Sequence, residues 1–117
     1  MKRDVNLFIQ DILENINDIE LFSKGLTKKE FANNKLKQNA IIRSLEVIGE
    51  AVKNIPDSFR KDYPNIPWKN ISGFRDILSH AYFGVNIDRV WNIIEKDLHS
   101  FKEEIEKIKI AEDSQIE

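Results

Sequence analysis

The sequence contains no cysteine, two histidines, three prolines and four glycines among its 117 residues. The absence of cysteine excludes disulfides and thiolate metal sites, and it suits the reducing cytoplasm, where we expect the protein to reside. Two histidines argue against a zinc site built from histidine ligands. Any acid–base chemistry near neutral pH must therefore depend on very few side chains.

Long apolar runs are also missing, so we expect no membrane-spanning segment. Residues 1–4 lead directly into an amphipathic pattern with acidic residues, which is unlike a signal peptide. The net charge is −2 and the isoelectric point is about 5.7, so the overall charge does not indicate nucleic-acid binding. Contact with RNA would need a local basic groove, which two subunits could build together.

Apolar residues do recur at three- and four-residue spacing along nearly the whole chain, which predicts helices. We expect these helices over residues 3–24, from 27 or 34 to 54 with a break near Asn33-Asn34, over 57–63, over 71–83 and over 87–110. Thr27 and Glu30 suit a capping box, Gly25 suits a C-terminal cap, and Asn86 can cap the last helix.

The predicted helices form one all-α domain over residues 1–110, an antiparallel bundle of four main helices with short connecting helices. Residues 111–117 are expected to be a flexible tail. The second and last long helices should bury one stripe each: Leu36, Ala40, Ile41, Leu45, Ile48 and Val52, then Val90, Ile94, Leu98, Phe101, Ile105 and Ile108.

The most distinctive stretch is Arg75-Asp76-Ile77-Leu78-Ser79-His80-Ala81-Tyr82. Arginine binds phosphate through a planar fork, and histidine titrates near neutral pH. His80 could act as the base on a ribose 2′-hydroxyl while Arg75 stabilises the charge that accumulates on the phosphate. Asp76 could orient His80, and Tyr82 could bind phosphate or stack on a base.

Helix geometry brings only some of these side chains together. At about 100° per residue, Asp76 and His80 lie about 40° apart, whereas Arg75 and His80 lie about 140° apart. The latter pair would converge through a distorted helix end, through long side chains that wrap a groove, or through a second subunit. A plainer interpretation stays open, in which these are surface charges, a structural histidine and a core aromatic.

Several further motifs stand in order around this stretch. The pattern Arg75-x4-His80-x-Tyr82 is similar to the Arg-x4-His-x-Tyr signature of HepT-type toxins, a branch of the HEPN ribonuclease superfamily. Residues 43–51 resemble the mid-chain helix of that branch, and residues 66–75 resemble its proline–tryptophan approach to the motif. Residues 82–86, followed by Val90-Trp91, resemble its exit.

The resemblance implies a HEPN-like homodimer with the motif in a cleft between subunits. It also implies metal-independent endoribonuclease activity that is toxic to the cell, with RNA as substrate and Arg75 and His80 as the catalytic pair. Asp76 and Tyr82 would support them, although Asp76 stands where the family often has Asn.

A partner is implied as well, an MntA-type minimal nucleotidyltransferase antitoxin that transfers AMP from ATP to Tyr82. The ATP and its Mg²⁺ would belong to that partner, so the resemblance implies no cofactor and no metal for this chain. Two other functions stay open on the sequence alone. One is a non-catalytic partner or regulator of a nucleotidyltransferase, and the other is a helical interaction module in which the cluster is incidental.

Overall fold

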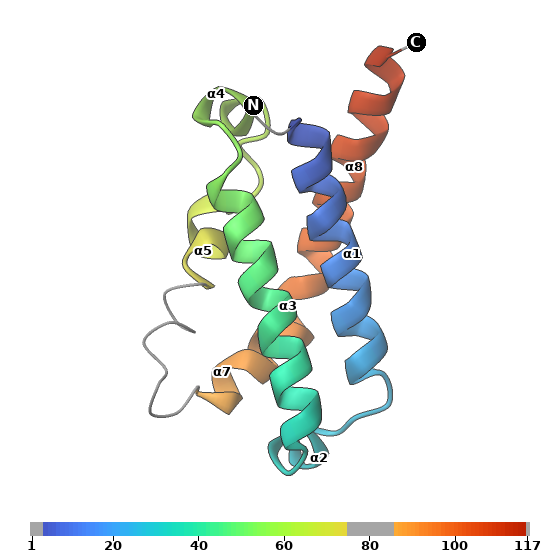
Figure 1. The fold of residues 1–117 in the computed structure, drawn as a ribbon, viewed down its shortest axis with the longest axis vertical. Coiled ribbons are helices and arrows are strands. Elements are labelled where there is room, and N and C mark those ends of the chain that lie inside the picture. The colour runs from blue at the N-terminus through green and yellow to red at the C-terminus, as the bar shows by residue number, and fades with distance from the viewer. Residues whose placement is uncertain (1–3, 75–85, 117) are drawn as a thin grey trace.

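The computed structural model describes residues 4–74 and 86–116, which form helices and turns with no strand among them (Figure 1). The three long helices are α1 (Val5–Ser23), α3 (Lys35–Lys53) and α8 (Leu98–Ile116). The shorter elements are α2 (Lys28–Ala32), α4 (Asp57–Lys61), α5 (Trp68–Ser72), α7 (Ile87–Asn92) and the π-helical turn η1 (Ile93–Asp97). The predicted all-α class is confirmed for this part of the chain.

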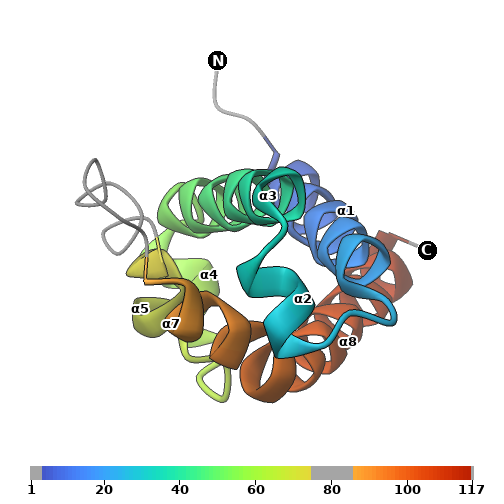
Figure 2. The ribbon, with the colours of Figure 1, turned by 90° about the horizontal axis from the view of Figure 1, so that it is seen from below.

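The helices surround a common apolar core, and Figure 2 shows them from the end that α2 covers. Most core side chains are aliphatic, and five aromatic side chains join them, those of Phe31, Trp68, Phe74, Trp91 and Phe101. Those below 1% exposure are Ile12, Ile16, Ile19, Phe31, Ile41, Leu45, Ile48, Val52, Val90 and Ile105. Burying an aliphatic side chain of this size contributes about 1.5–3 kcal/mol, so this core is the main source of stability. Among the described residues, no helix is both long and apolar enough to cross a membrane.

The predicted break between the first and second helical segments is confirmed, and local caps explain it. Gly25 follows α1 with a φ of 76°, a backbone conformation that costs glycine little. Thr27 and Glu30 form a reciprocal capping box in which both hydrogen bonds measure 3.1 Å. Asn34 then starts α3, because its Oδ1 accepts a hydrogen bond from the Lys37 backbone N–H at 3.0 Å.

The predicted inward stripe of α3 is correct for Ile41, Leu45, Ile48 and Val52 but wrong for Leu36, which is 78% exposed. Leu36 stands five residues before Ile41, which places it about 140° around the helix from that buried side chain. Ala40 is half-buried. Leu36 therefore faces away from the core, although it lies in the same helix.

The buried residues of the last helical region are spaced irregularly, which the sequence did not predict. Buried Val90, Ile93, Leu98, Phe101, Ile105 and Ile108 follow one another at intervals of three, five, three, four and three residues. The five-residue interval is the π-helical turn η1, whose wider ring absorbs one extra residue. For this reason Ile93 is buried and the predicted Ile94 is only half-buried.

Helix α8 runs to Ile116, so the predicted helix end at residue 110 is wrong by six residues. Glu112 in this extension accepts a hydrogen bond from the Tyr63 hydroxyl at 2.7 Å, although the two residues are far apart in sequence. That bond, followed by burial, raises the pKa of Tyr63 to about 12.

We expect Tyr63→Phe to lower the free energy of unfolding by about 1–2 kcal/mol below pH ~10, because a hydrogen bond to a charged group is lost. Since the pKa of Tyr63 is raised in the folded state, this contribution is complete below the ordinary tyrosine pKa and is lost as the pH rises toward 12. Denaturant unfolding of both proteins over this pH range measures the difference. A difference that stays constant up to pH ~12 would contradict the role of this bond.

Candidate active site

The predicted catalytic and supporting residues, Arg75, Asp76, His80 and Tyr82, fall within residues 75–85, outside the described residues. Most of the predicted helix over 71–83 and the predicted break at Gly84 lie there too. The structure defines the elements on both sides of this segment, which we call the frame. The described chain stops at Phe74 and resumes at Asn86.

The side that leads into the segment is α5, which begins at Trp68 and not at the predicted Ile71. Pro67 explains the earlier start, because proline is accommodated at the beginning of a helix. Helix α5 ends at Ser72, and Gly73 forms a turn before Phe74. A Cβ at Gly73 would approach the Asn70 carbonyl oxygen to 3.2 Å, so glycine suits this tight turn.

Two buried indole rings hold the frame to the core. The Trp68 Nε1 donates a hydrogen bond to the Tyr63 carbonyl oxygen at 3.0 Å, and the ring is 7% exposed. On the far side, Trp91 of α7 is 6% exposed and its ring centroid lies 5.3 Å from that of Phe31 in α2. This tilted arrangement is one that aromatic pairs favour.

The predicted cap at Asn86 is confirmed, because its Oδ1 accepts a hydrogen bond from the Arg89 backbone N–H at 3.2 Å. Helix α7 is therefore fixed at its first residue as well as through Trp91. Both chain ends that border residues 75–85 thus emerge from elements packed on the core, and α7 is also capped by a side chain.

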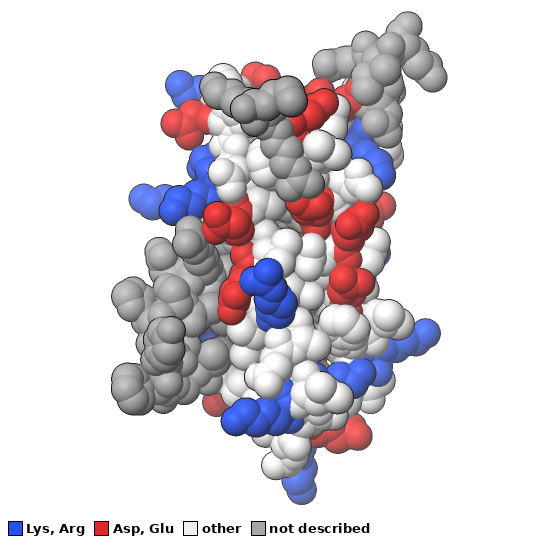
Figure 3. All heavy atoms as spheres, in the orientation of Figure 1, with Lys and Arg blue, Asp and Glu red and all other residues white. Residues whose placement is uncertain are grey.

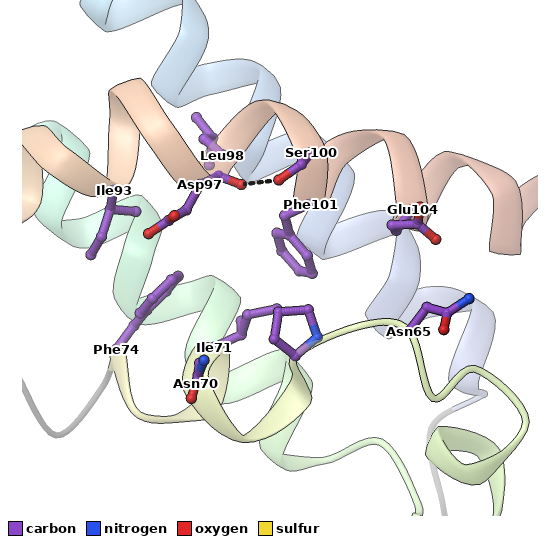
Figure 4. A pocket seen from close by; sticks show the side chains of 11 residues that line it. Asn65, Asn70, Ile71, Phe74, Ile93, Asp97, Leu98, Ser100, Phe101 and Glu104 are labelled. Atoms are coloured by element: carbon purple, nitrogen blue, oxygen red, sulfur yellow. Dashed lines mark hydrogen bonds between the residues drawn. The ribbon is translucent and has the colours of Figure 1, made fainter.

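A cavity of about 330 Å³ lies beside this frame, between α5 with its preceding turn and the η1–α8 region (Figure 4). Its apolar lining includes Phe74, the residue directly before Arg75. The full lining consists of Asn65, Pro67, Asn70, Ile71, Phe74, Ile93, Asp97, Leu98, Ser100, Phe101 and Glu104. None of its polar members was predicted from the sequence as a site residue. Of these, only Asp97 lies in the π-helical turn η1.

Charge on the face formed by α1 and α3 is mixed, and Figure 3 shows acidic and basic side chains interspersed over the coloured residues of that face. A specific pair joins α8 to α1, where Lys102 Nζ lies 2.7 Å from Glu20 Oε1. This hydrogen bond raises the pKa of Lys102. Among the side chains that the structure describes, no three histidine, aspartate or glutamate residues gather as a group that could hold a metal ion.

Comparison with known proteins gives matches over most of the chain. A family model described as "Ribonuclease HepT-like" matches residues 12–108. A protein of Methanocaldococcus jannaschii described as a "putative RNase" is 47% identical over 105 residues, which cover 90% of this chain and 96% of that protein.

Two other curated proteins are similar over most of their length. A second "putative RNase" of Methanocaldococcus jannaschii is 49% identical over 92% of this chain and 88% of its own. A "probable ribonuclease HepT" of Thermococcus cleftensis is 42% identical over 93% of this chain and 99% of its own. No solved structure matches the chain.

Proposed function

Because the chain belongs to the HepT-like ribonuclease family and is therefore an endoribonuclease, we propose that it is the toxin of a toxin–antitoxin pair. In this proposal it cleaves RNA in the cytoplasm without a metal and is neutralised by adenylylation of Tyr82. The observation that carries the proposal is the family match over residues 12–108, which spans the whole Arg75–Tyr82 stretch.

The proposed reaction needs only this chain's own side chains. His80 takes the proton from a ribose 2′-hydroxyl, whose oxygen then forms a bond to the adjacent phosphorus. The bond from phosphorus to the 5′-oxygen breaks, and that oxygen receives a proton from the His80 imidazolium as it leaves. Arg75 stabilises the negative charge on the phosphate oxygens through its bidentate fork.

We propose that the active form is a homodimer with the motif between the subunits. The described α1–α3 face carries mixed charge, and the overall charge is negative, so a basic groove for RNA is better supplied by two copies of the Arg75 segment. A second subunit also removes the difficulty that Arg75 and His80 would lie about 140° apart on one straight helix.

Control by adenylylation follows from the position of Tyr82 two residues after His80. An AMP group on its hydroxyl adds bulk and negative charge where the RNA phosphate would bind Arg75. The enzyme that transfers AMP from ATP, with its Mg²⁺, would be a minimal nucleotidyltransferase antitoxin. This chain would supply the acceptor hydroxyl only.

The test is to produce the protein with and without such a nucleotidyltransferase and to measure intact mass and RNA cleavage in EDTA. We expect the co-produced protein to gain the mass of one or more AMP groups at Tyr82 and to lose cleavage, because the phosphate site is filled. Tyr82→Phe removes the acceptor oxygen, so this variant should gain no mass.

Unmodified, folded protein that shows no cleavage would instead favour the non-catalytic partner of a nucleotidyltransferase. Cleavage that needs added metal would contradict the metal-independent mechanism while leaving the ribonuclease activity in place. Tyr63→Phe, which alters a tyrosine paired with Glu112, is the matched control and should still be modified.

A further inference from the structure

The cavity between α5 and the η1–α8 region has two apolar walls that face each other. In Figure 4 the Phe74 ring points into the space from the α5 side and the Phe101 ring points into it from α8. The two rings are 9% and 5% exposed, so their positions are fixed by the core behind them. A flat ligand that enters this space would contact preformed apolar surface.

The charges of the described residues that line the cavity disfavour a phosphate group as its occupant. None of these eleven described residues is Lys or Arg, whereas Asp97 and Glu104 are carboxylates. These two carboxylates would repel a phosphate, and the described lining offers it no cation. The occupant must therefore be uncharged or a hydrogen-bond donor toward acidic groups.

The polar groups of the lining suit the edge of a nucleobase. Asn65 and Asn70 offer amides that both donate and accept, and an ionised carboxylate accepts only. The Glu104 carboxylate is already paired with Lys107 at 3.1 Å. The Asp97 carboxylate has no ion pair or hydrogen bond within the described part of the chain, so it is the better acceptor.

The π-helical turn is the second observation that points to this cavity. Ile93 and Asp97 mark the first and last residues of η1, and both line the space. The wider turn directs them to one side, and π-helical turns occur often at functional sites. The Asp97 carbonyl is also held, since it accepts a hydrogen bond from the Ser100 hydroxyl at 3.2 Å (Figure 4).

We propose that this cavity is a binding subsite for one unpaired base of the RNA substrate, with Asp97 as the residue that selects the base. The inference rests on the proposed ribonuclease function and deepens it. A volume of about 330 Å³ is at the small end of ligand pockets, which suits a single base. Phe74, in the wall, directly precedes Arg75 in the chain, so a bound base would lie near the start of the catalytic segment.

The acceptor chemistry of Asp97 favours guanine. The Watson–Crick edge of guanine places an N1–H and an N2 amino group side by side, and a carboxylate can accept from both. Uracil offers one N–H between two carbonyl oxygens, which the carboxylate would repel. Proteins read single-stranded RNA bases in this way, by stacking and by hydrogen bonds to the base edge.

The experiment maps the cleavage sites of the unmodified full chain on a random-sequence RNA pool in EDTA. We expect guanine to be enriched at one fixed position near the cut. Asp97→Asn, which turns one acceptor oxygen into a donor, should reduce that enrichment about tenfold. The matched control is Glu95→Gln, which alters an exposed carboxylate of the same turn outside the cavity and should keep the preference.

A substrate change tests the same contact from the RNA side. Inosine lacks the 2-amino group of guanosine, so a defined RNA with inosine at that position should be cut several-fold more slowly by the unaltered chain. The difference should disappear in Asp97→Asn, because the partner of the amino group is gone. A difference that persists in this variant would assign the preference to another residue.

Each remaining outcome supports or overturns a definite part of the inference. Cleavage without a preferred base, or a preference that Asp97→Asn leaves intact, overturns the subsite and leaves the ribonuclease function standing. An absence of cleavage overturns both. Free guanosine that binds in competition with RNA supports the subsite, whereas guanosine that binds without affecting cleavage assigns the cavity to a free nucleoside.

Discussion

His80→Ala is expected to lower the rate of RNA cleavage by about 100- to 10,000-fold, because the variant loses the proposed acid–base group. His80 is one of only two histidines, and the chain has no cysteine that could take over the proton. Toxicity in producing cells should fall with the rate. Cleavage of a labelled RNA in EDTA, with equal amounts of folded protein, measures the change.

The other histidine supplies the matched control for this variant. The His99 side chain is 76% exposed on α8, where Nε2 lies 2.9 Å from Glu103 Oε1. His99→Ala should leave cleavage within about twofold, because an exposed side-chain contact of this kind contributes little even to stability. Equal activity of His80→Ala and the parent chain would remove His80 from the mechanism, and equal loss in both variants would point to a general defect.

Phe31→Ala is expected to destabilise the fold by about 3–5 kcal/mol, the largest effect on stability that we expect from a single change. The Phe31 side chain is fully buried, and its ring lies 5.3 Å from the Trp91 ring. Removing it leaves a cavity between α2 and α7. The free energy of unfolding of natural domains is only about 5–15 kcal/mol, so the variant loses a large share of its stability.

Denaturant unfolding measures this loss, with Leu36→Ala as the control on the neighbouring helix. Leu36 is 78% exposed, so its truncation should change the free energy of unfolding by less than about 0.5 kcal/mol. A loss below about 1 kcal/mol in Phe31→Ala would mean that the surrounding helices collapse into the space. Since Trp91 fixes the start of the last helical region, cleavage should also fall in this variant.

Apolar periodicity and capping chemistry predicted much of the fold, because both are local. The capping box at Thr27 and Glu30 and the Asn86 cap need only the residues beside them. Leu36 was assigned inward because it is apolar and lies in the right helix. Its angular position relative to Ile41 turns the side chain away from the core, and this angle follows from the helix period.

The candidate site was less accessible to sequence reasoning. The motif residues were recognisable from their chemistry and spacing, but their arrangement in space depends on residues 75–85, outside the described chain. The cavity joins a turn near Asn65 to Asp97 on a distant element, so only tertiary structure brings them together. Neither residue carries a local signal for binding.

The π-helical turn η1 has a consequence for how this gene can change in length. If one residue between Asn92 and Leu98 were deleted, the buried positions from Val90 to Ile108 would follow an unbroken alternation of three and four residues. The same residues of α8 would still face the core, while Ile93 and Asp97 would no longer share a widened turn. A single-codon deletion here is therefore a route by which evolution could remodel the cavity and leave the bundle intact.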